Sequence, residues 1–286
     1  MVEDMAGDIT EDMADDMADS AERGVLGVTR MLSPRLMAVA DGIVRLGRQD
    51  LIYDIGTDHA LLPIYLTGAG ICDSVEASDI SPKSIERAKR NAAAAGASDK
   101  IHFFTGDGFM SFPDFQDGKI IIIAGIGGKN LTEIIERGHG RPCRASALIL
   151  QPMSGQETLR EWMFNNSYDI PYERLAREGN RIYSLLFCRY TGAPIRYTQT
   201  EKFLGKRVEY ENENDYAHFL RFTRLKAMNR YAGLTKMSEN GNMQEVTETN
   251  GFGEMAVSLG GNKFDYEERE NLKIVIDEID RQLNLL

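Results

Sequence analysis

Three ionisable side chains gather in one short segment of this 286-residue chain, Tyr53-Asp54-Ile55-Gly56-Thr57-Asp58-His59. The segment follows an apolar run and precedes Pro63, which a helix tolerates only in its first turn. Residues 54–61 are therefore predicted to form a loop. A dinucleotide site would have the glycine spacing G-x-G-x-x-G, whereas this loop has a single glycine. Asp54, Asp58 and His59 disfavour NAD and suit a ligand that carries positive charge.

Polar residues also follow the next two apolar runs. Asp79 lies 25 residues after Asp54, at a place where an acid can accept hydrogen bonds from both hydroxyls of an adenosine ribose. Asp107, followed by Gly108, is expected to accept from an adenine amino group. Each of the two acids has a purely structural alternative, a helix cap for Asp79 and a turn for Asp107.

A fourth apolar run ends in a glycine cluster, where ligand and backbone can approach closely. The cluster comprises Gly125, Gly127 and Gly128. Polar or glycine residues thus follow four apolar runs in succession. The set matches S-adenosyl-L-methionine, which has a ribose, an adenine and a cationic methionine end. Asp54, Gly56 and Asp58 are expected near that end, and His59 either hydrogen-bonds it or has a structural role.

The elements that must position these residues lie between Met31 and about Tyr190, where helical and extended patterns alternate. This alternation is typical of an α/β fold with a Rossmann-like, doubly wound sheet. Five predicted strands and a closing antiparallel pair span residues 51–54, 74–79, 101–105, 119–124, 147–151, 170–176 and 181–190. Ligands of such sheets bind outside the carboxyl ends of the strands, which is where the candidate residues fall.

The two ends of the chain differ from this middle part. Residues 1–30 hold nine acidic and two basic residues, a composition typical of disorder. An acidic interaction tail, or a translation start at Met31, are the alternatives. Residues 191–286 are predicted to be a helical hairpin domain, with a coiled-coil-like pair of helices over 213–237 and 264–285. A flexible loop is predicted at about 238–262.

Composition narrows the class of protein further. No apolar run reaches the ~18 residues of a membrane span. The three cysteines are widely spaced, which argues against a disulfide scaffold or a metal site and suits the cytoplasm. Nothing in the sequence calls for an obligate protein partner. The net charge of −11 comes mostly from residues 1–30, so it does not exclude a nucleic-acid substrate.

Basic residues concentrate on the predicted helix 213–237, where a phosphate backbone could bind. The expected nucleic-acid contacts are Arg221, Arg224, Lys226 and Arg230. A solvated amphipathic face is the alternative interpretation. The apolar side of the same helix is predicted to comprise Phe219, Phe222, Leu225, Met228 and Ala232.

Four segments resemble the bacterial tRNA (adenine(22)-N1)-methyltransferase family. They are Leu32-Ser33-Pro34-Arg35-Leu36, Asp54-Ile55-Gly56-Thr57-Asp58-His59-Ala60, Gly125-Ile126-Gly127-Gly128 and Leu150-Gln151-Pro152. The resemblance extends from about Leu32 to Leu286, apart from the loop at 238–262, and includes the helical pair. It implies a class I methyltransferase that uses S-adenosyl-L-methionine to methylate N1 of an adenine in tRNA. The family often has Tyr where this chain has Leu61.

By position, the resemblance assigns Asp58 and His59 to the catalytic centre, and Gly125, Gly127 and Gly128 to a floor that faces the target base. The adenine N1 lone pair attacks the methyl carbon without a general base, so positioning dominates, and Asp58 is expected to stabilise the cationic product. The base must first leave its stack. Two alternatives stay open, a methyltransferase for a small molecule or protein and a non-catalytic cofactor- or RNA-binding protein.

Overall fold

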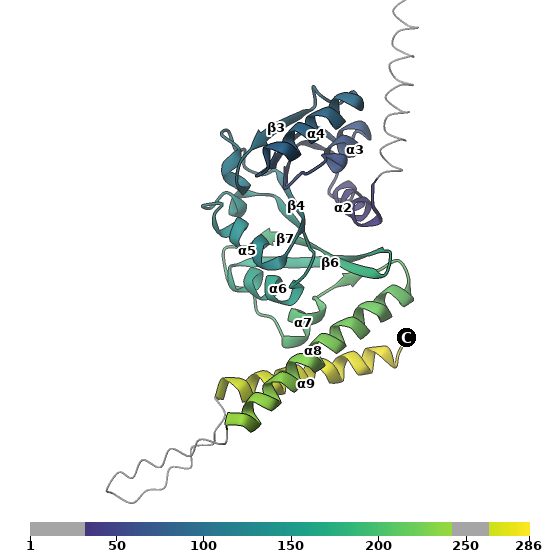
Figure 1. The fold of residues 1–286 in the computed structure, drawn as a ribbon, viewed down its shortest axis with the longest axis vertical. Helices are drawn as coiled ribbons and strands as arrows, with labels where there is room; N and C mark the ends of the chain where they lie inside the picture. The colour runs from purple at the N-terminus through teal and green to yellow at the C-terminus, as the bar shows by residue number, and fades with distance from the viewer. Residues whose placement is uncertain (1–31, 242–262) are drawn as a thin grey trace, which may run out of the picture. The chain divides into compact units, whose positions relative to one another are not determined.

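The computed structural model describes residues 32–241 and 263–286 (Figure 1). The predicted tail, residues 1–30, lies outside the described residues. The predicted loop begins later than expected, because helix α8 continues to Gly241, and the rest of that loop also lies outside them. Contacts divide the chain into two compact units. The first comprises residues up to Arg196 together with Lys206–Glu209, and the second comprises Tyr197–Gly205 and Tyr210–Leu286.

One mixed eight-stranded sheet forms the first unit, in the order β3-β2-β1-β4-β5-β7-β6-β8. The first five strands are parallel, and β7 pairs antiparallel with both β5 and β6. The α/β Rossmann-like fold is therefore confirmed. The strands are β1 Gln49–Ile55, β2 Cys72–Asp79, β3 Ile101–Thr105, β4 Ile120–Ile126, β5 Ala147–Pro152, β6 Tyr168–Glu178, β7 Arg181–Tyr190 and β8 Val208–Glu209.

Helices alternate with most of the strands, as the sequence pattern predicts (Figure 1). They are α2 Pro34–Val44, α3 Leu61–Gly68, α4 Pro82–Ala94, α5 Gly128–Glu136 and α6 Gln156–Asn165, with short 3-10 turns at Gly108–Ser111 and Pro142–Arg144. Helices α3, α4 and α5 connect parallel strands. Pro63 stands in the first turn of α3, where its missing N–H leaves no intrahelical hydrogen bond unmade. This placement leaves the preceding loop free to line the edge of the sheet.

Strand β4 lies beside β1 at the centre of the sheet, where the strand order reverses. Ile120, Ile121, Ile122 and Ile123 are each at most 1% exposed, because helices or neighbouring elements cover both faces of a central parallel strand. Burial of this run fixes the register of β4 against β1 and β5. The glycine cluster that follows β4 is thereby held at the carboxyl edge of the sheet.

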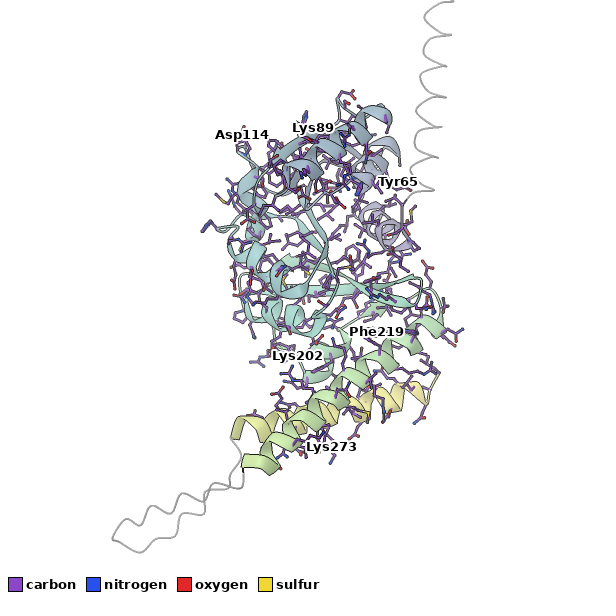
Figure 2. The ribbon with its side chains drawn as sticks, viewed as in Figure 1. Tyr65, Lys89, Asp114, Lys202, Phe219 and Lys273 are labelled. Atoms are coloured by element: carbon purple, nitrogen blue, oxygen red, sulfur yellow. The ribbon has the colours of Figure 1, made fainter. Side chains whose placement is uncertain are left out.

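The second unit contains α7 Gln199–Leu204, α8 Glu213–Gly241 and α9 Lys263–Leu283, with α8 and α9 packed together. On α9, the apolar residues Leu272, Val275 and Ile279 are buried. Phe219 is buried on α8 and is labelled in Figure 2.

The predicted apolar face of α8 is only partly correct. Phe222, Leu225 and Met228 are 41–56% exposed, whereas Leu220, Thr223 and Ala227 take the buried positions. Ala232 is exposed as well. The face that meets α9 is thus rotated from the predicted one. Large apolar residues alone do not identify the contact face, because small residues allow the two helices to approach closely.

Candidate active site at the carboxyl ends of the strands

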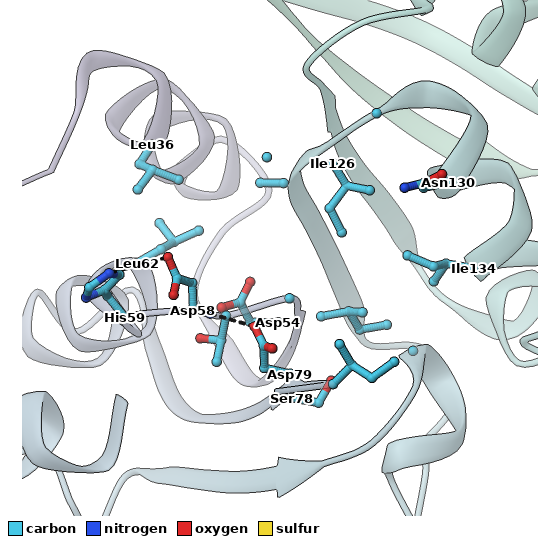
Figure 3. Close-up of a pocket in the computed structure, with 18 of the residues that line it drawn as sticks. Leu36, Asp54, Asp58, His59, Leu62, Ser78, Asp79, Ile126, Asn130 and Ile134 are labelled. Atoms are coloured by element: carbon cyan, nitrogen blue, oxygen red, sulfur yellow. Dashed lines mark hydrogen bonds and ion pairs between the residues drawn. The ribbon is translucent and has the colours of Figure 1, made fainter. Parts of the chain in front are cut away.

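A cavity of about 880 Å³ opens at the carboxyl ends of β1, β2 and β4. Nine of the residues predicted for the cofactor, the catalytic centre or the target base line it together: Asp54, Gly56, Asp58, His59, Asp79, Asp107, Gly108, Gly125 and Gly127. Figure 3 shows Asp58 and His59 on one side of the cavity and Asn130 and Ile134 on the other. The parallel sheet therefore brings residues from four separate segments into one site.

The loop after β1 is attached to the end of β2 through its backbone. The amides of Gly56 and Thr57 both donate to the carbonyl of Ser78, at 2.8 and 2.9 Å. Gly56 has φ +80°, and a Cβ there would lie 3.2 Å from Cδ1 of Ile126. Glycine is required at this position because other residues rarely adopt that conformation.

Asp79 holds the same loop through its side chain. One carboxylate oxygen accepts from the Asp58 amide at 3.2 Å, and the other accepts from the Ser81 amide at 2.8 Å. A carboxylate has about four acceptor positions, so Asp79 retains capacity for the hydroxyls of a ribose. The cap at the start of α4 is made by the Ser81 side chain and not by Asp79.

Asp58 and Ala60 both have left-handed backbone conformations, with φ of +47° and +55°. Such conformations are uncommon for residues other than glycine, but Asp and Asn adopt them more readily than most. The Asp58 side chain is 61% exposed and lies 3.5 Å from Nε2 of His59. The loop thus presents a solvated carboxylate to the cavity.

Asp54 differs sharply from Asp58 in its surroundings, since only 5% of it is exposed. Burial, together with the negative charge of Asp79, raises the pKa of its carboxyl group to about 6. A buried carboxyl group of this kind becomes a stronger partner for a cation once it ionises.

Contacts with α4 hold His59 in place. Nη1 of Arg87 lies 2.9 Å from its Nε2, and the side-chain amide of Asn91 donates to its carbonyl oxygen at 2.9 Å. A guanidinium group can only donate, so Nε2 accepts in this contact. His59 thus links the cavity wall to α4.

Asp107 pairs with Arg137, with N–O distances of 3.2 and 3.3 Å, and both side chains are half-exposed. The neighbouring Gly108 has φ +56°, and a Cβ there would lie 3.1 Å from Ile134. Glycine at this position keeps the wall between β3 and α5 open.

The glycines at the end of β4 and just after it have different roles. Gly125 and Gly127 line the cavity, whereas Gly128 is buried beneath the loop that follows β5. The Gly128 amide donates to the Ser154 carbonyl at 2.8 Å. Gly128 therefore supports the floor of the site from below, and its surface does not face the cavity.

We expect Gly128→Ala to lower the free energy of unfolding by about 1–3 kcal/mol, because the added methyl group overpacks a rigid site. Its Cβ would lie 2.6 Å from the Gly155 carbonyl oxygen and 2.8 Å from that of Ser154. Urea denaturation measures the effect. Gly127→Ala is the matched control, since its Cβ would be 3.6 Å from the nearest atom. Equal stabilities of the two variants would contradict this account.

A hydrogen-bond network that the sequence-based prediction missed supports the same floor. Gln151 is fully buried, and its side-chain oxygen accepts from Nη1 of Arg35 at 2.6 Å and from the Gly125 amide at 3.0 Å. Arg35 also donates from Nε to Glu178 at 3.3 Å. Arg35 and Gln151 both lie in segments that resemble the family, but no sequence pattern predicted that the two side chains meet, and none included Glu178.

The cavity fits a cationic nucleoside cofactor. Six acidic side chains line it, against two arginines. Two hydroxyl oxygens on its wall, those of Ser33 and Ser78, are buried without a hydrogen-bond partner among the described residues. Buried polar atoms are normally paired, so these two indicate that the wall receives a polar ligand. Within the described ranges, no cluster of His, Cys, Asp or Glu has the geometry of a metal site.

The predicted tRNA contacts on α8 belong to the second unit, and two of them are engaged with α9. Arg224 forms a two-point ion pair with Asp280 at 2.6 and 3.0 Å, and Arg230 pairs with Glu268. Lys226 lies 6.0 Å from the ring of Phe222. Arg221 is exposed. Much of the expected basic surface therefore holds the helical hairpin together.

Known proteins show the same combination of fold and sequence. The family profile described as "Methyltransferase domain" matches residues 32–186. MG248 of Mycoplasma genitalium, provisionally named a tRNA methyltransferase, is 30% identical over 178 residues, which make up 62% of this chain and 78% of MG248. The tRNA (adenine(22)-N(1))-methyltransferase of Bacillus subtilis is 31% identical over 155 residues, 54% of this chain and 63% of that protein.

Among solved structures, Sp1610 of Streptococcus pneumoniae in complex with S-adenosyl-L-methionine, provisionally a tRNA (m1A22) methyltransferase, has the same fold. Its TM-score is 0.64 at 22% identity, over 86% of this chain and 99% of that one. Fold, cavity and family profile together define a class I methyltransferase that depends on S-adenosyl-L-methionine. The chain belongs to the tRNA (adenine(22)-N1)-methyltransferase family.

Proposed function

We propose that the protein transfers the methyl group of S-adenosyl-L-methionine to N1 of an adenine in tRNA, at position 22 as in the B. subtilis relative. The observation that carries the proposal is the set of acidic strand-end residues around one cavity, in a chain 31% identical to that enzyme over 155 residues. The bound cofactor supplies an electrophilic methyl group on a sulfonium.

The acidic residues divide the work of cofactor binding. Asp79 accepts from the ribose hydroxyls with the capacity its two amide contacts leave. Asp54 and Asp58, with Gly56 between them, face the positively charged methionine end. Asp107 and Gly108 form the adenine end of the cavity. The Arg137 side chain donates a hydrogen bond to the Asp107 carboxylate there.

The side chains of this enzyme do not need to remove a proton from N1, because that nitrogen has a free lone pair. Their task is to hold the base in line with the transferred methyl group and to stabilise the charge that develops on it. Asp58 is the catalytic carboxylate, and His59 lies beside it, with 3.5 Å between Nε2 and the carboxylate. Gly125 and Gly127 let the base approach the floor closely. Leu61 lines the same cavity without a hydroxyl group.

Reverse transcription of a methylated transcript tests this function directly, because a methyl group on N1 blocks base pairing. The protein is incubated with methyl-labelled cofactor and unmodified tRNA transcripts. A new stop at adenine 22, absent from a transcript with guanine at that position, supports the proposal. Label in protein or in a small molecule would overturn it in favour of another methyltransferase. Cofactor binding without any transfer would favour a non-catalytic binding protein.

Gly128 supports the floor of the site in the first unit. The second unit contributes tRNA contacts through Arg221, which is exposed. We expect Arg221→Glu to weaken tRNA binding about three- to tenfold at low salt, because a phosphate contact is replaced by repulsion. Fluorescence anisotropy with labelled tRNA measures the change. Lys273→Glu on α9 is the control, since it makes the same charge change at another exposed position (Figure 2). Equal losses in both variants would argue against a specific contact.

Arg224 and Arg230 are unsuitable for that experiment. Reversing Arg224 would place two acidic side chains together at Asp280 and remove a partly exposed ion pair, which is worth up to about 1 kcal/mol. Weaker tRNA binding by such a variant would report on the helical hairpin as much as on the RNA.

A further inference from the structure

Helix α4, in the first unit, which contains the candidate active site, has a basic surface with few acidic side chains beside it. Its four basic residues face a single acid, Glu86, and all five are exposed. The basic residues are Lys83, Arg87, Lys89 and Arg90, and Lys89 is labelled in Figure 2. The buried side of the helix is made by Ile85, Ala88 and Ala92. Its outer side is thus strongly positive on a protein whose net charge is negative.

These cations form no ion pairs with acids among the described residues. Cations elsewhere in the same unit commonly do, for example Arg137 with Asp107 and Arg144 with Asp117. An unpaired cation keeps its full charge available to a ligand. A cluster of such cations produces a local potential that attracts an anion even when the protein as a whole is acidic.

Three of the cations share one face of α4. Successive helical positions rotate by about 100°, so Lys83, Arg87 and Arg90 lie within about 60° of one another. Along the axis, they span roughly 10 Å at ~1.5 Å per residue. We refer to these three residues as the α4 basic face. A row of cations of this length can follow several phosphates of a nucleic-acid strand.

The α4 basic face borders the active-site cavity. Arg87 contacts the ring of His59 at 2.9 Å, and Asn91 on the adjacent side of the helix donates to the His59 carbonyl. At its amino end, α4 follows Asp79 by two residues, and the Ser81 amide donates to the Asp79 carboxylate. The two cavity residues that α4 and its amino-terminal cap contact are therefore His59 and Asp79.

We propose that the α4 basic face binds the RNA backbone next to the nucleotide that enters the cavity. The inference rests on the proposed function and names the part of the catalytic unit that holds its substrate. Because six acids line the cavity, an RNA strand that approaches it is repelled unless cations beside the opening offset them. Lys83 and Arg90 bind phosphates, and Arg87 joins this surface to the wall at His59.

The test reverses charge at the two members that do not contact the cavity, in the variant Lys83→Glu/Arg90→Glu. The matched control is Lys100→Glu/Arg189→Glu, which makes the same change of charge at two exposed positions near the amino ends of the parallel strands. Binding to the tRNA transcript is measured from ~50 to ~300 mM salt. Cofactor affinity by calorimetry reports whether each variant is folded, and Lys83→Gln/Arg90→Gln replaces the first variant if it is not.

We expect the α4 variant to bind tRNA at least about tenfold more weakly and its salt dependence to fall by about 0.7–0.9 per lost phosphate contact. Cofactor affinity and the behaviour of the control should be unchanged. Equal tRNA affinities of the α4 variant and the parent protein, or equal losses in both variants, would overturn the proposal. If tRNA binding depends on α4 but no adenine is methylated, the proposed function fails and the basic face stands. If the α4 variant binds normally and adenine 22 is methylated, only the basic face fails.

Discussion

The Asp58→Asn variant is expected to transfer methyl groups to tRNA roughly 10²- to 10³-fold more slowly than the parent protein, the loss typical when one stabilising group is removed from a developing charge. N1 of the adenine acquires a positive charge as the methyl group is transferred, and the Asp58 carboxylate is the exposed acid in the loop after β1. Asn keeps the size of the side chain and removes its charge. Single-turnover rates at saturating tRNA and cofactor measure the effect.

The structure indicates that this variant will fold. Asp58 has φ +47°, a conformation that Asn adopts as readily as Asp, and its amide contact with Asp79 does not involve the side chain. Thermal unfolding should therefore be nearly unchanged. Asp99→Asn, at an exposed position near the amino ends of the strands, controls for loss of one negative charge. A near-normal single-turnover rate for Asp58→Asn would remove this residue from the mechanism.

The second large effect concerns Asp54. Its pKa is about 6 in the folded protein, against an ordinary value of 3.8 for an aspartate, so the folded state binds this proton more tightly than the unfolded state does. The resulting contribution favours folding below about pH 4 and is lost as pH rises through about 6. At 1.36 kcal/mol per pKa unit, the difference is about 3 kcal/mol. Without cofactor, Asp54→Asn should therefore be more stable than the parent protein at pH 7.5 by up to that amount.

Cofactor binding should show the opposite preference for pH. A cationic ligand favours the ionised carboxylate, so the affinity of the parent protein for S-adenosyl-L-methionine should rise about tenfold between pH 5 and pH 7 as Asp54 ionises. Asp54→Asn should bind more weakly at pH 7 and lose most of this pH dependence. Calorimetry in two buffers with different ionisation enthalpies measures both the affinity and the proton release. Affinity that is constant over this range in the parent protein would contradict the role of Asp54.

The combination of these two effects has a simple physical origin. Burial makes an ionised Asp54 unfavourable in the free protein, and a cation bound beside it removes much of that penalty. Local stability is thus exchanged for ligand affinity, as at many functional sites.

The amino-acid sequence by itself determined the α/β fold and many of the acidic and glycine residues of the cavity wall. Asp54, Asp79, Asp107 and Gly125 each follow an apolar run, and the carboxyl ends of parallel strands meet at one edge of a sheet. Local pattern was sufficient for these residues, because strand direction alone decides where they lie. The chain must turn sharply at the end of β1, and this turn explains the conformation of Gly56.

Only the tertiary structure decided which side chains meet across long separations in the chain. Arg35 and Gln151 are 116 residues apart and share a hydrogen bond, while Arg224 lies against Asp280 and not in open solvent. The contact face of α8 was also decided at this level, since Phe222 and Leu225 are exposed in spite of their apolar character. Periodicity shows where apolar residues lie on a helix, but the packing partner decides how many of them are covered and which charges remain free.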